Sequence, residues 1–340
     1  MRDKKIALGI VLASILLVGS AIVPTGYDVL FADEPIMLDE LVDYEDGYEL
    51  DGEIGMTYVS SLENVGWPYL VLGMLFEEGV DIEPAATEEL DIDVEDLHYQ
   101  YEMMMIQSKI KAEYKAREYM DDSPDLTLTG FYPAYFEPDW KYKNMIKVTD
   151  ILVAMDGVEL ESYEQLDQLI LEKEPDEKAV LSVMRDGERK DIEVRTYPER
   201  DYYNNTFLGM YVEEVFELVE DERISFNIEE IGGPSAGLML TLTLIEKMTE
   251  ESLLKGNKVA GTGTIEMDGF VGPIGGVKQK VIGADLAGYE YFLVPEDNDY
   301  GNNEEIAKQT VKGEGLSIKL IPVGSLEEAV AELKKLPENK

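Results

Sequence analysis

The chain has 340 residues, enough for two or three domains, and 45% hydrophobic with 9% aromatic residues is a globular composition. It carries 72 acidic residues against 29 basic ones, a formal net charge of −43. A field of that sign repels polyanions, so no nucleic-acid partner is expected. The chain has no cysteine, which excludes disulfides and thiolate metal sites but does not assign a compartment.

Residues 1–24 are expected to be a cytoplasmic tip followed by a transmembrane anchor. The first five residues are net basic, and Ile6 to Val23 then form an uncharged stretch of 18 residues, long enough for one membrane-spanning helix. The flank after this stretch is acidic, and the positive-inside rule places the basic N-terminus in the cytoplasm and everything after Pro24 outside it. A cleaved signal peptide is the alternative, with Gly19-Ser20-Ala21 as a small-residue cleavage site.

Residues 25–120 are interpreted as an acidic lead followed by a helical region. Tyr99 to Met120 has apolar residues at three- and four-residue steps, which predicts one long helix. The acidic stretch from Asp81 to Asp96 lacks the spaced glycine-containing loop of a calcium site, so no metal is expected there.

Residues 121–200 form a second, β-rich segment. An apolar strand ends at the Asp156-Gly157 turn, and Ser162 with Gln165 forms a capping box for the next helix. A hairpin with Asp186-Gly187 at its turn follows. This order resembles a PDZ domain, over residues 146–197 mainly. The resemblance implies a loop whose backbone amides hold a peptide carboxylate, and Gly130-Phe131 is the nearest match for it.

Residues 201–340 contain the stretch that carries the chemistry. Ser235 lies in Gly-Pro-Ser-Ala-Gly, directly before an apolar helix, where free backbone N–H groups can hold an oxyanion. The motif also fits a helix-capping serine or the nucleophile elbow of α/β-hydrolases. The elbow needs a histidine after the serine, and the single histidine, His98, comes before it.

A serine needs a base, and a lysine made neutral by burial can supply one. Lys278 follows a Gly-Gly turn at the start of a predicted helix. Taken alone it would be a solvated surface residue, whereas Lys280, two positions on, would face another side of the helix.

These motifs, in this order and spacing, resemble the proteolytic domain of Lon proteases, which use a Ser-Lys dyad. The resemblance runs from about Gly209 to Leu336. It implies Ser235 as nucleophile, Lys278 as base and Thr262 in Gly-Thr-Gly-Thr-Ile as the residue that orients the lysine. Residues 208–228 would supply the strands that lead to the serine, and Gly233, Pro234 and Ala236 would form the oxyanion turn. The chain departs from many Lon enzymes in having Gly232-Gly233 where an acidic residue stands.

The whole chain resembles the YlbL-type family of membrane-anchored, PDZ-containing, Lon-like serine proteases. The implied fold is α+β and multidomain: a transmembrane helix, a PDZ-like β-rich domain and a Lon-type α/β proteolytic domain. The implied function is an endopeptidase without cofactor or ATP that cleaves unfolded or flexible protein segments outside the cytoplasm, with a hexameric ring as a possible assembly. The sequence contains no P-loop motif. The alternative is an inactive scaffold with a peptide-binding module.

Overall fold

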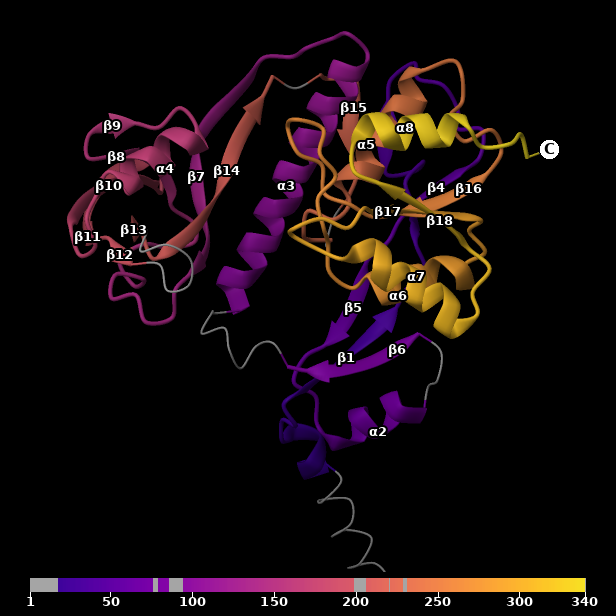
Figure 1. The fold of residues 1–340 in the computed structure, drawn as a ribbon, viewed down its shortest axis with the longest axis horizontal. Helices are drawn as coiled ribbons and strands as arrows, with labels where there is room; N and C mark the ends of the chain where they lie inside the picture. Colours follow the sequence, from indigo (N-terminus) through magenta and orange to yellow (C-terminus); the bar gives the residue numbers. More distant parts are fainter. Residues whose placement is uncertain are drawn as a thin grey trace, which may run out of the picture. The chain divides into compact units, whose positions relative to one another are not determined.

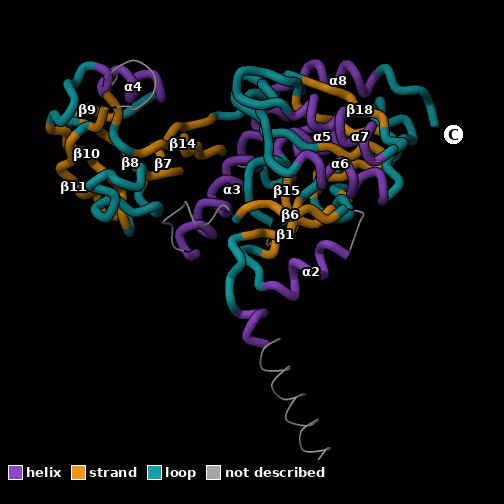
Figure 2. Tube along the Cα trace, turned by 60° about the horizontal axis from the view of Figure 1, so that its bottom comes forward, coloured by secondary structure: helices purple, strands orange, loops and turns teal. Residues whose placement is uncertain are grey.

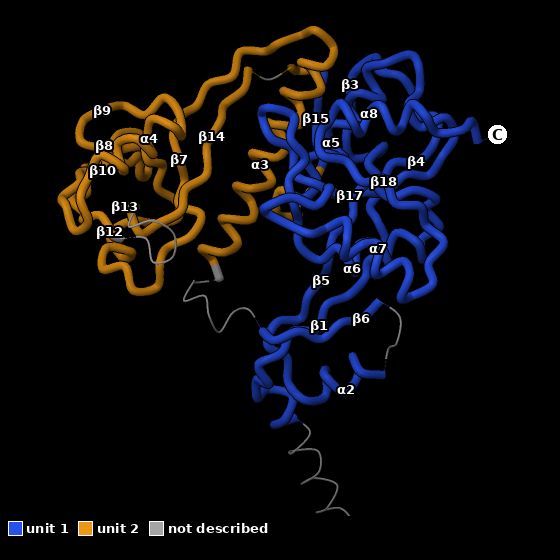
Figure 3. The backbone as a smooth tube through the Cα atoms, in the orientation of Figure 1, with its two compact units in different colours: residues 1–91, 223–227, 235–340 blue, residues 92–222, 228–234 orange. Residues whose placement is uncertain are grey.

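The computed structural model describes residues 18–75, 79–85, 94–198, 206–219, 221–228 and 231–339. The chain divides into two compact units, coloured in Figure 3. Unit 1 comprises residues 1–91, 223–227 and 235–340, and unit 2 comprises residues 92–222 and 228–234. These units divide the chain differently from the segments expected from the sequence. The first part of residues 25–120 belongs to unit 1, and its helical part belongs to unit 2.

Unit 2 is built on a six-stranded antiparallel sheet, a two-stranded sheet of β12 and β13, and a long helix. Its elements are α3 (Val94–Tyr119), β7 (Leu126–Phe136), β8 (Ile151–Met155), β9 (Val158–Glu159), α4 (Tyr163–Leu171), β10 (Lys178–Arg185), β11 (Glu188–Arg195), β12 (Tyr197–Pro198), β13 (Thr206–Phe207) and β14 (Met210–Leu218). The sheet order is β11-β10-β8-β7-β14. Ser162 Oγ accepts from Gln165 N at 3.2 Å, which confirms the predicted helix cap. Positive φ at Asp186 and Gly187 confirms the hairpin turn.

The strand β14 corrects one expectation from the sequence. Residues 208–228 were expected to lead as strands into the serine of the proteolytic domain. Instead, the first strand of this segment, β14, pairs antiparallel with β7 from Met210 opposite Phe136 to Leu218 opposite Leu126, and only the strand Ile224–Phe226 lies in the unit that contains Ser235. A strand pairs with the partner that buries its apolar face, and the buried Val215 and Phe216 meet that need in the sheet of unit 2.

Unit 1 contains a mostly parallel sheet in the order β18-β17-β16-β4-β2. Its strands are β2 (Ile36–Met37), β4 (Glu53–Met56), β16 (Lys258–Gly261), β17 (Tyr291–Pro295) and β18 (Lys319–Val323). β4 pairs in parallel with β16, so this segment of the early chain completes the sheet formed by the late chain. Two short strands, β3 (Val42–Tyr44) and β15 (Ile224–Phe226), pair with each other beside it.

Four helices cover this sheet: α5 (Gly237–Met248), α6 (Val277–Leu286), α7 (Asn303–Glu314) and α8 (Leu326–Lys334). Eleven residues of α5, from Gly237 to Lys247, are buried, as the mainly apolar run from Leu238 to Ile245 predicts. α6 packs against β16 and α7 through Val277, Val281 and Ala284, in a core shared with Phe292. Figure 1 shows α6 and α7 side by side.

The N-terminal part of unit 1 adds a three-stranded antiparallel sheet and one helix. The sheet has the order β5-β1-β6, with β1 (Tyr27–Ala32), β5 (Val59–Leu62) and β6 (Val80–Pro84), and the helix is α2 (Trp67–Leu75). In Figures 1 and 2 this sheet lies between α2 and α6. No helix within the described ranges is both long enough and apolar enough to span a bilayer, and the predicted anchor falls largely on residues 1–17, outside those ranges.

We predict opposite effects for two glycine-to-alanine changes within helices of unit 1. A Cβ at Gly283 in α6 would lie 2.0 Å from the carbonyl oxygen of Asp33, whereas a Cβ at Gly313 in α7 meets no atom within 4 Å. Gly283→Ala should therefore lower the free energy of unfolding by about 1–3 kcal/mol through overpacking. Gly313→Ala should raise it by roughly 0.5–1 kcal/mol through helix propensity. Urea denaturation measures both changes, and equal effects would contradict the close packing of α6.

Candidate active site

Ser235 lies two residues before α5 and is half buried. Its backbone is fixed by the segment after β16, since Gly263 N donates to Ser235 O at 2.9 Å and Leu238 N donates to Gly263 O at 3.1 Å. Gly263 has a φ of 156°. A Cβ there would lie 2.8 Å from Val271 Cγ1, so the close approach requires glycine. The loop and the helix start therefore hold the serine in one place.

Lys280 is the lysine that contacts the serine. Its Nζ donates to Ser235 Oγ at 3.0 Å and to Thr262 Oγ1 at 3.1 Å. Thr262 in turn donates its hydroxyl hydrogen to Ser235 O at 3.1 Å. Lys280 is 4% exposed and Thr262 is fully buried. Serine, lysine and threonine thus form one closed hydrogen-bonded group.

The environment of Lys280 favours its neutral form. Burial lowers the pKa of Lys280 from 10.5 to about 8, because the ammonium loses its hydration. Desolvation is the one cause of this shift, and its neighbours in the group are hydroxyls rather than carboxylates. A substantial fraction of the amine is therefore unprotonated slightly above neutral pH.

The expected pairing of Ser235 with Lys278 is wrong in this structure. Lys278 Nζ bonds to Asp81 Oδ2 of β6 at 2.8 Å, and its side chain is 40% exposed. Successive residues of a helix turn by about 100°, so two residues separated by two positions point in nearly opposite directions. Lys278 therefore lies on the outer side of α6, while Lys280 points into the site.

The spacing of apolar residues along α6 could have identified Lys280 from the sequence. Val277, Val281 and Ala284 are spaced as one apolar face of a helix, and all three are buried. Lys280 is three residues after Val277 and four before Ala284, so it shares that face. The motif alone does not distinguish two lysines in Val-Lys-Gln-Lys, whereas the apolar spacing around them does.

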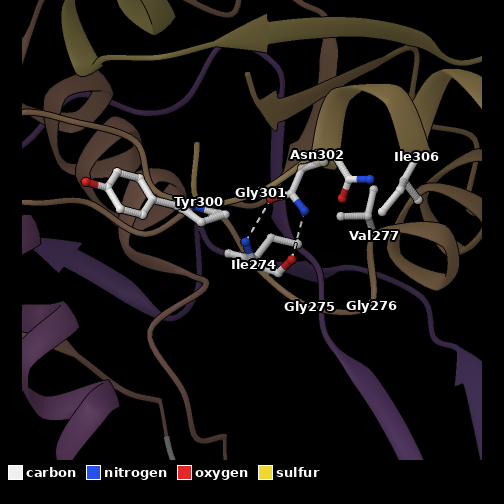
Figure 4. A pocket seen from close by; sticks show the side chains of 10 residues that line it. Ile274, Gly275, Gly276, Val277, Tyr300, Gly301, Asn302 and Ile306 are labelled. Carbon is white, nitrogen blue, oxygen red and sulfur yellow. Dashed lines mark hydrogen bonds between the residues drawn. The ribbon is translucent and has the colours of Figure 1, made fainter. Parts of the chain in front are cut away.

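The turn before α6 sets the start of this helix. Asn303, which is buried, accepts from Ile274 N at 2.8 Å and donates to Ile274 O at 2.9 Å. Gly276 then adopts a φ of 67° as the residue that caps α6. Figure 4 shows the pocket of about 450 Å³ that Ile274, Gly275, Gly276 and Tyr300 line at this turn. The turn thereby fixes which residues of α6 face the serine.

Unit 2 has a groove of its own, with a volume of about 240 Å³. One wall is α4, through Leu166, Ile170 and Leu171, and the other is the segment Thr206–Val212 at the start of β14. Gly209 within this segment has a φ of 78°, and a Cβ there would lie 2.4 Å from Trp140. β14 is the edge strand of its sheet, and Gln107 bonds to both the N–H and the carbonyl of Phe216 on that edge. An extended chain can therefore be added beside the Met210–Val212 end of β14.

Comparison with known proteins finds one matching family within each unit. Residues 230–334 match the model of the Lon protease (S16) C-terminal proteolytic domain, and residues 140–196 match that of the PDZ domain. The chain carries a PDZ domain and a Lon proteolytic domain. The Lon S16 domain is that of a serine peptidase family.

The Lon domain is similar to that of curated Lon proteases. It is 37% identical over 106 residues to the Lon protease of Trichlorobacter lovleyi, which covers 31% of this chain and 12% of that protein. It is 38% identical over 106 residues to the Lon protease of Buchnera aphidicola, covering 31% and 13%. The chain thus spans about an eighth of the length of these relatives.

Among solved structures, the chain is similar to the PDZ domain of an SdrC-like protein from Listeria monocytogenes, with 13% identity and a TM-score of 0.24. That match covers 25% of this chain and 90% of the other. A PDZ domain from Listeria innocua matches with 12% identity and a TM-score of 0.23, covering 24% and 92%.

In the PDZ domain, the structure corrects the expected carboxylate-binding loop. Gly130 and Phe131 lie within β7, an inner strand of the sheet, and Phe131 is fully buried in the core opposite Leu152. Inner strands have neighbours on both sides, so their amides are not offered to a ligand. The groove instead lies beside Phe207-Leu208-Gly209-Met210, whose apolar-Leu-Gly-apolar pattern was the available signal in the sequence.

In the Lon domain, Ala236 precedes α5 directly, so the first N–H groups of the helix lie next to Ser235. Gly233 and Pro234 belong to unit 2, where Gly233 N donates to Tyr101 O at 3.0 Å and Ser108 Oγ donates to Pro234 O at 3.3 Å. Pro234 has no N–H and Gly233 already uses its own. Of the three residues expected at the oxyanion turn, Ala236 therefore retains the best geometry for that role.

We predict a pH-dependent stability gain for Lys280→Met, which keeps the length of the side chain but removes the amine. Between pH 8 and pH 10.5 the unfolded parent binds one more proton at this lysine than the folded parent does. The free energy of unfolding of the parent therefore rises with pH over this window. The variant has no amine at this position, so its free energy of unfolding does not show this rise. The stability advantage of the variant over the parent should therefore shrink by about 3 kcal/mol between pH 8 and pH 10.5.

Urea denaturation across this pH range measures the difference. Lys278→Met serves as the control, because Lys278 is exposed and paired with Asp81. If the stability difference for Lys280→Met is the same at pH 8 and pH 10.5, Lys280 titrates normally in the folded chain.

Proposed function

We propose that this chain is a serine endopeptidase whose catalytic dyad is Ser235 and Lys280. One observation carries the proposal: Lys280 Nζ lies 3.0 Å from Ser235 Oγ, in a buried position that lowers the pKa of the lysine to about 8. A general base must lie within hydrogen-bond reach of the proton that it takes, and its pKa should be close to the working pH. Lys280 meets both conditions.

The reaction follows from these two side chains. Neutral Lys280 accepts the hydroxyl proton of Ser235 while Oγ attacks the carbonyl carbon of the substrate peptide. The resulting Lys280 ammonium gives its proton to the leaving nitrogen as the C–N bond breaks, which leaves an ester on Ser235. Lys280 then takes a proton from water, the resulting hydroxide attacks the ester, and the proton returns to Ser235 Oγ as the acid product leaves.

Two further groups complete the proposed site. Thr262 accepts a hydrogen bond from Lys280 Nζ and donates one to the backbone of Ser235. It would therefore hold the lysine and the serine at a fixed distance from each other during the reaction. The oxyanion would be stabilised by the backbone N–H groups of Ala236 and Gly237 at the start of α5, because the first N–H groups of a helix have no partner within the helix. Leu238 N already donates to Gly263 O and is not part of this set.

The proposal extends to location and substrate. The uncharged stretch Ile6–Val23 after a basic N-terminus supports a single-pass anchor with the catalytic unit outside the cytoplasm. These 340 residues contain no P-loop, so we propose that cleavage by this chain does not use ATP. Without an unfolding motor, the substrates would be unfolded or flexible protein segments. Assembly into a homo-oligomer such as a hexamer is a further part of the proposal.

The PDZ domain would select such segments by their chain ends. The groove between α4 and the Thr206–Val212 segment has apolar walls and an open strand edge, which suit an extended peptide that ends in an apolar residue. Capture of a chain end there would raise its local concentration near the protease that belongs to the same chain.

We predict that Ser235→Ala and Lys280→Ala each lower kcat for casein cleavage by at least about a hundredfold, because each removes half of the dyad. Lys278→Ala should retain most of the activity, and it is the matched control on the same helix. In the parent, kcat/KM should rise with pH to a plateau with a midpoint near pH 8, since the neutral amine is the active form.

Labelling with a fluorophosphonate probe provides a second readout at pH 9. Loss of labelling in the Lys278 variant together with full labelling in the Lys280 variant would overturn the assignment. A folded parent that neither labels nor cleaves casein would instead support an inactive scaffold.

We predict that Leu171→Glu weakens peptide binding by about fivefold or more, because it places a charge on the apolar wall of the groove. The probe is a fluorescein-labelled decapeptide that ends in leucine with a free carboxylate, and fluorescence anisotropy gives its Kd. Val158→Glu, an equally apolar and exposed position on β9, should bind as the parent does. Equal Kd values for the parent, both variants and the C-terminal amide of the peptide would place the binding site elsewhere.

A further inference from the structure

The helix α2 exposes an unusual amount of apolar surface. Its sequence, from Trp67 to Leu75, contains no charged residue. Only Leu70 and Gly73 are buried, against Val29 of β1. Six large apolar or aromatic side chains of this one short helix are each between 47% and 72% exposed: Trp67, Tyr69, Val71, Leu72, Met74 and Leu75. A helix that is apolar on every side is stable only when its outer face is also removed from water.

The end of the uncharged N-terminal stretch lies directly against the start of α2. Residues 18–22 are helical, and Val18, Ile22 and Val23 are exposed. A Cβ at Gly66, the residue before α2, would lie 2.3 Å from the carbonyl oxygen of Ala21. Pro24 forms a β-bridge with Gly66, and Thr25 N donates to Val65 O at 3.1 Å. The two apolar surfaces are therefore continuous.

The charge pattern indicates the chemistry of the partner. The sequence has no lysine or arginine from residue 6 to residue 108. Neither α2 nor the strands that pack against it carry a cation for anionic headgroups, so we take contact with an apolar phase as the main force at α2. Trp67 and Tyr69 at the start of the helix are the residue types that prefer the boundary between water and lipid.

We propose that α2 lies in the lipid interface of the membrane beside the predicted anchor. This inference rests on the anchor that forms part of the proposed function and deepens it. The sheet β5-β1-β6 lies between α2 and α6, and the Lys278–Asp81 ion pair ties α6 to β6. One sheet layer thus separates the lipid from the helix that carries Lys280. The substrates are then protein segments close to the membrane surface.

The test uses the full chain in phosphatidylcholine liposomes and its own tryptophans. The chain has two, Trp67 on α2 and the buried Trp140 of the PDZ domain. Liposomes made with 6,7-dibrominated phosphatidylcholine should quench the emission of the parent by about a third or more, and the Trp67→Phe variant should lose this quenching. Replacing part of the lipid by anionic phosphatidylglycerol should not increase it, because α2 carries no basic residue.

Variants on α2 separate lipid contact from other effects. Leu72→Glu combined with Leu75→Glu should abolish the quenching of Trp67, whereas Leu286→Glu, at a similarly exposed leucine on α6, should leave it unchanged. The double variant should cleave a palmitoylated casein peptide in liposomes about tenfold more slowly, and the acetylated peptide in solution at the rate of the parent. Equal effects on both peptides would overturn the membrane-proximal substrate.

The outcomes distinguish the possible occupants of this face. Trp67 that resists both brominated lipid and aqueous acrylamide would indicate a second protein copy on α2 and overturn the proposal. If the chains float with liposomes but acrylamide quenches Trp67, then α2 lies in water. That outcome overturns the proposal for α2 but remains consistent with the N-terminal anchor. Chains that do not float would contradict the anchor and this inference together, while casein cleavage would still report the dyad.

Discussion

The site depends on one costly constraint, an amine held away from water without a carboxylate to balance it. In the described part of the chain, the contacts of Lys280 Nζ are the hydroxyls of Ser235 and Thr262. A paired carboxylate would stabilise the ammonium and remove the base. The hydroxyls tolerate either protonation state, because each can donate or accept. The departure from the acidic residue of many Lon enzymes is therefore compatible with a lysine that must lose its proton.

Such a constraint requires a rigid surround. Three separate segments between Ser235 and Lys280 meet at the amine: the loop before α5, the residue after β16 and α6 itself. Two of them are held by close contacts that leave no room for a side chain, at Gly263 against the Val271 side chain and at Gly283 against the Asp33 backbone. Asn303 then fixes the turn from which α6 begins. The desolvation of Lys280 is thus a property of the packing and not of its immediate sequence.

This explains how far the sequence could lead. Ser235, Thr262 and the capped helix at Ser162 were predictable because short motifs encode local geometry. The choice between Lys278 and Lys280 depends on which side of α6 is buried, and reading the motif alone favoured the wrong residue. Gly130-Phe131 was likewise a plausible loop by composition, yet it became an inner strand once β14 paired with β7. The sequence pattern says little about which distant strands pair with each other. The edge strand and the groove could therefore be identified only from the structure.

The position of β4 has a consequence for the order in which the chain can fold. Unit 2 is inserted into unit 1, and β4 stands between β2 and β16, with Ile54 opposite Val259. As the chain emerges during synthesis, the PDZ unit can close as soon as β14 is present. The sheet of unit 1 must wait for β16 to β18, so β4 has an open edge until then. Ser235 and Lys280 are consequently brought together last, and a nascent or truncated chain would carry a folded PDZ domain without a complete Lon domain.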